Sequence, residues 1–140
     1  MPGSTDQKLR RILSTYKTIA VVGLSNRPER PAQTVPAYLQ QQGYRIIPVN
    51  PTLTEALGEK AYASLRDIPE PVEIVEIFRR IEDVPPIIED AIVIGARVVW
   101  MQSGIVNQAA AARAEAAGLQ VVMDACMGET HRALRARGEI

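Results

Sequence analysis

The sequence predicts an α/β fold, namely a single Rossmann-like domain in which helices cover both faces of a five-stranded parallel sheet. Three times, an amphipathic segment ends in glycine and is followed two or three residues later by a β-branched apolar run, at Gly43, Gly95 and Gly118. Glycine just past a helix end supplies the left-handed conformation that closes the last turn, so these are expected helix-to-strand joints. The 140 residues, 46% of them apolar, suffice for one core without disulfides or a structural metal.

Five short apolar runs are the expected strands, because strands covered on both faces of a parallel sheet read as continuous apolar stretches. They are residues 19–22, 46–49, 72–77, 98–100 and 121–123. Only the third run contains charges, Glu73 and Glu76. We therefore expect that strand at an edge, with both carboxylates in water, and a strand order of 3-2-1-4-5.

Five segments with helical periodicity are expected to connect or flank these strands. They are residues 8–16, 33–42, 83–94, 107–117 and 128–137. The clearest is 83–94, where Val84, Ile87, Ile88 and Ala91 fall on one stripe. Alternating strands and helices with right-handed crossovers form an open sheet covered on both faces. We expect one domain over residues 1–140, with a core of about 15–135.

Composition excludes several classes of protein. The 16 basic residues balance the 16 acidic ones, which argues against nucleic acid as a partner. A lone Cys126 and a lone His131 provide neither a disulfide nor a zinc site. The longest nearly apolar run, 91–101, is too short to span a bilayer, and residues 1–6 do not resemble a signal peptide. We expect a cytoplasmic protein that contacts no membrane and holds no metal.

The first expected strand leads into a loop suited to an anion. In open α/β sheets, ligands bind beyond the carboxyl ends of the strands. Glycine lets backbone amides approach a phosphate, and the N-terminus of the next helix favours negative charge. The loop offers Gly23, Ser25, Asn26, Arg27 and Arg30. The competing interpretation is a solvated turn stiffened by two prolines.

The loop lacks the dinucleotide fingerprint, which needs three glycines and an acidic residue near the end of the second strand. Only Gly23 is present, and the second strand ends in Val49, Asn50 and Pro51 with no carboxylate before Glu55. The residues favour an adenosine-phosphate pocket that is not tuned to NAD. An NADP(H)-binding sensor or oxidoreductase stays open as an alternative.

Several segments together carry a family resemblance that spans about residues 15–135. They are residues 21–25, 43–51, Gly58 before Tyr62, 78–79, 99–104 and 124–126. In order and spacing the chain resembles stand-alone bacterial coenzyme A-binding proteins. These are similar to the CoA-binding domain of the succinyl-CoA synthetase alpha subunit and of the NDP-forming acyl-CoA synthetases.

The resemblance implies coenzyme A or an acyl-CoA as ligand, and it implies a set of contacts. The pyrophosphate would lie at Gly23, Leu24, Ser25 and Asn26, and the adenosine beside Val49, Asn50 and Pro51. Phe78, Arg79 and Arg80 would line the nucleotide and the upper pantetheine. Trp100, Gln102 and Gly104 would border the pantetheine path. The cations near the expected mouth are Arg27, Arg30, Arg79 and Arg80.

The resemblance does not extend to catalysis. The synthetases use a phosphorylated histidine in a later domain and ATP-grasp machinery, neither of which is expected in these 140 residues. We therefore expect a binding module, carrier or sensor that meets an unidentified catalytic protein partner. A small acyl-CoA enzyme with an unidentified catalytic residue is the remaining alternative.

Three further side chains have competing interpretations. His131, in the last expected helix, is expected to be solvated rather than catalytic. Cys126 is expected to be a packed thiol, or else to form a mixed disulfide with CoA under oxidation. Trp100 serves as core at a strand end, as a pantetheine contact, or as both.

Overall fold

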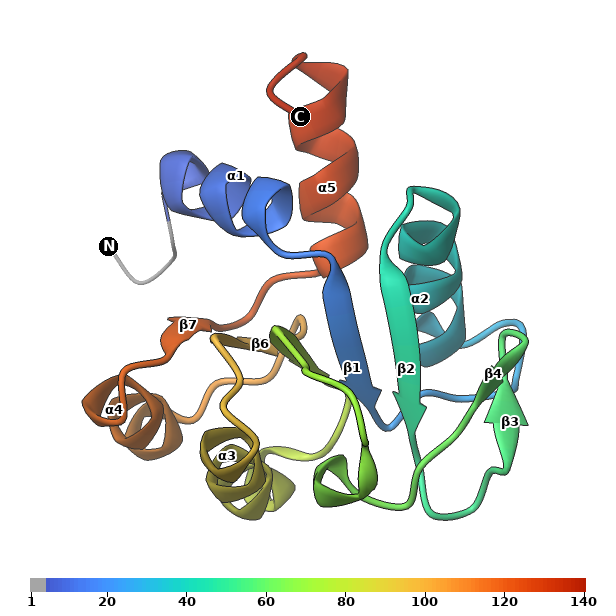
Figure 1. The fold of residues 1–140 in the computed structure, drawn as a ribbon. Helices are drawn as coiled ribbons and strands as arrows, with labels where there is room; N and C mark the ends of the chain where they lie inside the picture. The colour runs from blue at the N-terminus through green and yellow to red at the C-terminus, as the bar shows by residue number, and fades with distance from the viewer. Residues whose placement is uncertain (1–4) are drawn as a thin grey trace.

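The computed structural model describes residues 5–140, and it has the predicted α/β architecture (Figure 1). Five parallel strands form one sheet in the order β2-β1-β5-β6-β7. Their bounds are β1 Thr18–Val22, β2 Arg45–Val49, β5 Ile74–Ile77, β6 Val98–Met101 and β7 Gln120–Val122. The expectation about the start of the chain falls mainly on residues 1–4, outside the described residues.

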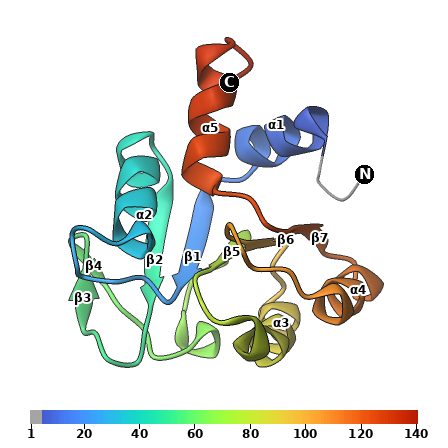
Figure 2. The same cartoon turned by 180° about the vertical axis from the view of Figure 1, so that it is seen from behind.

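Helices cover both faces of the sheet. They are α1 Asp6–Thr15, α2 Pro31–Gln41, α3 Val84–Val93, α4 Gln108–Ala116 and α5 Met127–Ala136, each within two residues of its predicted bounds. Figures 1 and 2 show α1, α2 and α5 on one side of the sheet and α3 and α4 on the other. Gly43, Gly95 and Gly118 have φ of +99°, +77° and +93°, which confirms the predicted helix ends. None of the helices within residues 5–140 combines the length and apolar character that crossing a membrane requires.

The sheet divides the core into two apolar clusters, because successive strand residues point to opposite faces. On β1, Ala20 and Val22 belong to the cluster under α3 and α4, whereas Ile19 and Val21 belong to the cluster under α1, α2 and α5. Both clusters are buried, so the central strands are removed from water on both sides.

The predicted strand order of 3-2-1-4-5 is wrong. The third predicted strand, β5, lies at the centre of the sheet between β1 and β6, which gives 2-1-3-4-5. Its charges do not mark an edge, for two separate reasons. Glu73 precedes the strand and accepts hydrogen bonds from the backbone of Lys17 and Thr18, and Glu76 is fully buried rather than solvated.

The connection from β2 to β5 contains a small hairpin that the sequence did not predict. Strands β3 Glu55–Ala56 and β4 Glu59–Lys60 are antiparallel, and two 3-10 turns, η1 Leu65–Asp67 and η2 Ile81–Asp83, lie further along the chain. Backbone hydrogen bonds join Tyr62 to Pro48 and Asn50 at 3.0 and 2.9 Å. The connection therefore runs beside the carboxyl end of β2.

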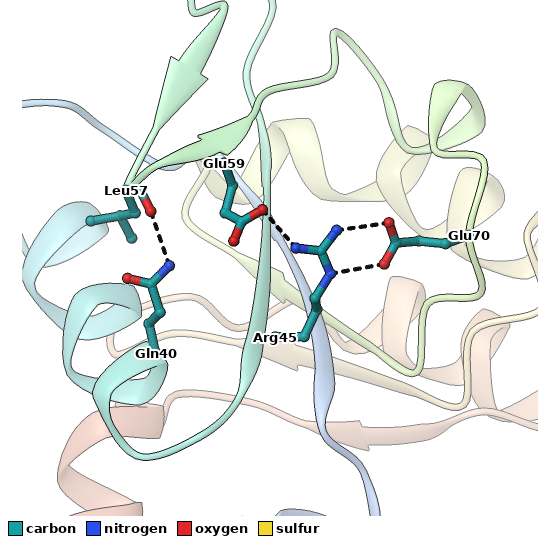
Figure 3. Close-up of polar contacts among 5 residues, drawn as sticks. All are labelled: Gln40, Arg45, Leu57, Glu59 and Glu70. Carbon is teal, nitrogen blue, oxygen red and sulfur yellow. Dashed lines mark hydrogen bonds and ion pairs between the residues drawn. The ribbon is translucent and has the colours of Figure 1, made fainter.

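Arg45, at the start of β2, ties this connection to the sheet (Figure 3). Its Nε and Nη2 donate to the two carboxylate oxygens of Glu70 at 2.9 and 2.8 Å, and its Nη1 donates to Glu59 at 2.6 Å. Gln40 on α2 donates to the carbonyl oxygen of Leu57 at 3.0 Å. Figure 3 shows these contacts holding the hairpin and the segment before β5 on either side of one guanidinium.

Candidate functional site

The main cavity, of about 790 Å³, opens at the carboxyl ends of β1, β5, β6 and β7. Its walls come from residues 30–32, 78–80, 102–103 and the single residues Asp83, Ile105, Cys126 and Glu129. From β1 the chain continues to β2 on one side, and from β5 it continues to β6 on the other side. The direction of the strand order therefore reverses between β1 and β5, and open α/β sheets bind ligands at such a switch point. The volume lies in the usual range for small-molecule sites.

A much smaller cavity, of about 120 Å³, lies beside the ends of β1 and β2. It is lined by Val22, Val49, Pro51, Arg79, Ile87, Asp90 and residues 63–65. The β2-to-β5 connection therefore builds one of its walls. Arg79 belongs to the walls of both cavities.

Gly23 allows the loop after β5 to pass close to the loop after β1. Its φ is +93°, and a Cβ atom at this position would lie 2.2 Å from the carbonyl oxygen of Phe78. The Gly23 amide donates to Val49 at 2.8 Å. Glycine is thus required here because two backbone segments meet, and that meeting brings Phe78 and Arg79 to the cavity.

The rest of the β1–α2 loop is held by hydrogen bonds within the loop and to the segments that follow β2. The Ser25 hydroxyl accepts from the amide of Arg27 at 3.0 Å, and Asn26 donates to the backbone of Glu55 at 3.0 Å. Asn50 donates to the carbonyl of Leu24 at 3.0 Å and accepts from Thr52. The Asn50 side chain therefore shapes the turn beside the smaller cavity.

The structure gathers about half of the predicted site residues at the two cavities. Arg30, Phe78, Arg79, Arg80 and Gln102 line the main cavity, and Val49, Pro51 and Arg79 line the smaller one. The other predicted residues lie outside both walls: Gly23, Leu24, Ser25, Asn26, Arg27, Asn50, Trp100 and Gly104.

Trp100 on β6 and Gly104 in the loop after it are both hydrogen-bonded to the loop after β7. Trp100 is 0% exposed, and its indole N–H donates to the carbonyl of Ala125 at 2.8 Å. In this structure the side chain therefore packs in the core. The Gly104 amide donates to the carboxylate of Asp124 at 2.7 Å, which joins the loop after β6 to the loop after β7.

Three arginines line the main cavity, together with the carboxylates of Asp83 and Glu129. Arg80 is 74% exposed and pairs with Asp83 at 3.1 Å and Glu82 at 3.7 Å. These carboxylates raise the pKa of Arg80. Arg30 and Arg79 have no carboxylate partner among residues 5–140. They are therefore the cations on this wall with hydrogen-bonding capacity for an anionic ligand.

A buried carboxyl group lies behind this wall, at a position where the sequence predicted a solvated one. Glu76 on β5 is 0% exposed, and Gln102 Nε2 donates to its Oε2. Burial raises the pKa of Glu76 to about 8, against the smaller opposing effect of the Gln102 hydrogen bond. The signal was present in the sequence, because apolar Ile74, Val75 and Ile77 on both sides are typical of a strand covered on both faces.

Cys126 and His131 lie in different surroundings. Cys126 precedes α5 and is partly exposed on the wall of the main cavity, so the mixed disulfide with CoA stays a prediction. The expectation that His131 is solvated is wrong. The residue is 5% exposed, its Nδ1 pairs with the hydroxyl of Tyr38 at 2.8 Å, and the Tyr44 ring packs edge-on against it. Burial lowers the pKa of His131.

Comparison with known proteins agrees with this architecture. A family model described as a CoA binding domain matches residues 17–132. The uncharacterized protein YneT of Bacillus subtilis (strain 168) is 44% identical over 131 residues, covering 94% of this chain and 97% of YneT. A hypothetical protein from Pyrococcus horikoshii OT3 is 43% identical with a TM-score of 0.93, covering 96% of this chain and 95% of its own.

A larger enzyme contains a similar domain. The dinucleotide forming acetyl-coenzyme A synthetase 1 of Ca. Korarchaeum cryptofilum, solved with phosphate and ADP, is 25% identical with a TM-score of 0.72. The match covers 81% of this chain and 26% of the synthetase. These similarities confirm the resemblance seen in the sequence, and the chain belongs to the CoA binding domain family.

Proposed function

We propose that the protein binds coenzyme A or an acyl-CoA at the carboxyl ends of the strands. The observation that carries this proposal is the position of Arg79, which lies on the walls of both cavities. Coenzyme A has an adenosine 3′-phosphate at one end, a diphosphate in the middle and a long pantetheine arm. A ligand of that shape needs two adjoining cavities with cations between them.

The residues suggest how such a ligand would lie. The adenosine would sit beside Val49 and Pro51 at the smaller cavity. The phosphates would meet Arg79 and Arg30, on a wall that also contains the N-terminal residues of the 11-residue α2. The pantetheine arm would follow the main cavity past Gln102 toward Cys126. Each charge-assisted hydrogen bond would contribute about 1.5 to 3 kcal/mol.

In this proposal the chain serves as a binding module, a carrier or a sensor, and a separate protein supplies any chemistry on the bound thioester. We place it in the cytoplasm, where a free thiol such as that of Cys126 stays reduced. The NADP(H) alternative is decided by the same experiment that tests CoA binding.

The experiment is an equilibrium titration of the protein with CoA, acetyl-CoA, NAD and NADP. Binding is followed by calorimetry and by the fluorescence of Trp100. This buried residue lies two positions before Gln102, and Gln102 lines the main cavity. We expect CoA and acetyl-CoA to bind at least tenfold more tightly than either pyridine nucleotide. Uptake of NADP without uptake of CoA would overturn the proposal.

A matched pair of arginine variants reports where the ligand binds. Arg79→Gln removes the cation shared by the two cavities and should weaken CoA binding about tenfold or more. Arg113→Gln removes an exposed arginine on α4 that pairs with Glu89 on α3, and it should leave CoA affinity unchanged. Equal affinities for the two variants would place the ligand elsewhere.

A further inference from the structure

Glu76 lies in the apolar layer directly behind the main cavity. In the sheet register it stands between Val21 on β1 and Trp100 on β6, and all three residues are 0% exposed. A carboxyl group in such surroundings costs free energy unless its oxygens are hydrogen-bonded. A central strand would accommodate an aliphatic residue at this position without that cost. We therefore expect the carboxyl group to have a role that an aliphatic side chain could not fill.

The contact that Glu76 makes leads to the cavity wall. Its Oε2 accepts a hydrogen bond from Gln102 Nε2, and its Oε1 has no partner among residues 5–140. Gln102 is 5% exposed, and it lines the main cavity. One side chain thus touches both the buried carboxyl group and the space available to a ligand.

A glutamine amide has one donor end and one acceptor end. Since Glu76 holds the donor end of Gln102, the carbonyl oxygen of Gln102 is the end left for the cavity. We propose that Glu76 is a positioning residue that fixes the Gln102 amide so that the cavity wall presents a hydrogen-bond acceptor to an N–H group of the ligand. This inference rests on the proposed function, because the pantetheine arm of CoA carries two secondary amides that supply such N–H groups.

The proton on Glu76 controls how firmly the amide is held. A carboxylate only accepts hydrogen bonds, so it selects the donor end of Gln102. A carboxylic acid also donates, and it tolerates the reversed amide with the carbonyl turned inward. Because burial raises the pKa of Glu76 to about 8, the fixed orientation is favoured as the pH rises through that value.

Other titratable groups also lie near this wall. Comparing the wild type with a Glu76 variant separates the effect of Glu76 from theirs. The flanking strands β1 and β6 carry none. The loops and helices around the cavity contribute Arg30, Arg79, Arg80, Asp83, Cys126 and Glu129. On the same side of the sheet, α1 carries Asp6, Lys8, Arg10 and Arg11, α2 carries Tyr38, and α5 further carries His131, Arg132 and Arg135. All of them are retained in a Glu76 variant, so their titration cancels in the ratio of wild-type to variant affinity.

The test compares CoA with adenosine 3′,5′-bisphosphate, which keeps the adenosine and two phosphates but lacks the pantetheine amides. At pH 9, Glu76→Gln should bind CoA about two- to tenfold more weakly than wild type, the range for one neutral hydrogen bond. Its affinity for the bisphosphate should stay within twofold. The wild-type advantage for CoA should shrink on going from pH 9 to pH 7.

The control is Glu73→Gln, the same chemical change at the opposite end of the strand, where the carboxylate contacts the backbone of Lys17 and Thr18. It should leave both affinities unchanged. Gln102→Met is the second variant, and it keeps Glu76 while removing the amide. Its CoA affinity should fall by the same factor as that of Glu76→Gln, and its own ratio of CoA to bisphosphate affinity should no longer follow the titration of Glu76.

The outcomes separate this inference from the proposed function. Failure of the wild type to bind either ligand overturns the proposed function and the positioning role with it. Normal binding by the wild type together with unchanged CoA affinity in both variants overturns the positioning role alone. An equal loss toward CoA and the bisphosphate also overturns it, because Glu76 would then support the fold rather than a pantetheine contact.

Discussion

Replacing Glu76 by glutamine should change how the stability of the protein depends on pH. The side chain is fully buried, and burial raises its pKa from the ordinary value of 4.5 to about 8. Between these two values the folded chain keeps a proton that the unfolded chain has released. The stabilising effect of that proton is complete below pH 4.5 and is lost progressively as the pH rises toward 8.

The size of the effect follows from the same pKa difference. Each pH unit within this window changes the free energy of unfolding by about 1.4 kcal/mol per bound proton. Between pH 5.5 and 7.5 the wild type should therefore lose about 3 kcal/mol relative to Glu76→Gln, which has no proton to exchange at this position. That loss is a large fraction of the stability of an ordinary domain, about 5–15 kcal/mol.

Urea unfolding at pH 5.5, 6.5 and 7.5, followed by circular dichroism and Trp100 fluorescence, measures this difference. Glu89→Gln is the matched control, because the hydrogen bond from Arg113 lowers the pKa of Glu89 and the carboxylate is ionised in both states across this range. Its difference from wild type should not vary with pH. If the Glu76→Gln difference were equally constant, the carboxyl group would not be buried as the structure places it.

Three further predictions concern the loops around the cavities. Gly23→Ala places a methyl group 2.2 Å from the Phe78 carbonyl oxygen and should destabilise the protein by about 2–4 kcal/mol. Gly43→Ala, where φ is +99° and the space around the residue is open, should cost only about 1–2 kcal/mol. Thermal unfolding of the two variants measures both costs. An equal cost would show that the close approach yields easily. Dephospho-CoA should bind about 1.5–3 kcal/mol more weakly than CoA, because an arginine would contact the 3′-phosphate that it lacks. In Arg79→Gln, calorimetry should show equal affinities for the two ligands. A difference that persists in the variant excludes Arg79 as the contact. Arg45→Met should lower the free energy of unfolding by only about 0.5–2 kcal/mol, because the contacts of Arg45 with Glu59 and Glu70 are partly exposed. Urea unfolding should show a smaller loss in 1 M salt, which screens exposed charges strongly. A loss that does not change with salt would contradict its ionic origin.

The five helices and the five strands of the main sheet were predictable from the sequence, because their signals are local, whereas the short β3–β4 hairpin was not. Periodicity placed the helix 83–94 within one residue of the observed Val84–Val93, and glycines marked the helix ends at Gly43, Gly95 and Gly118. Such signals depend on neighbouring residues and on the burial of one helix face. They carry little information about which strands become neighbours.

The strand order could not be read in the same way. We inferred an edge position for β5 from its two glutamates, since a charged residue usually stays in water. Glu76 escapes that rule because it is neutral over much of the pH range and has Gln102 as a partner, which lies 26 residues away in the sequence. Interactions over such distances appear only when the sheet is assembled.

The candidate site was predictable in its position and only partly in its residues. The rule that ligands bind at the carboxyl ends of strands located both cavities, and Arg30, Arg79 and Gln102 lie on their walls. That the loop 23–27 holds phosphate stays a prediction; its Asn26 side chain donates to the Glu55 backbone, and its Ser25 hydroxyl accepts from the Arg27 amide. Gly23 is needed for its contact with the Phe78 backbone, a three-dimensional constraint that a single glycine in the sequence does not reveal.

A crystal structure of the protein grown with CoA tests the central claim most directly. We predict that the phosphates contact Arg79, that the adenosine lies beside Val49 and Pro51, and that the pantetheine arm runs past Gln102 in the main cavity. Density for the ligand at any other surface, or none at saturating CoA, would contradict the assignment of this site.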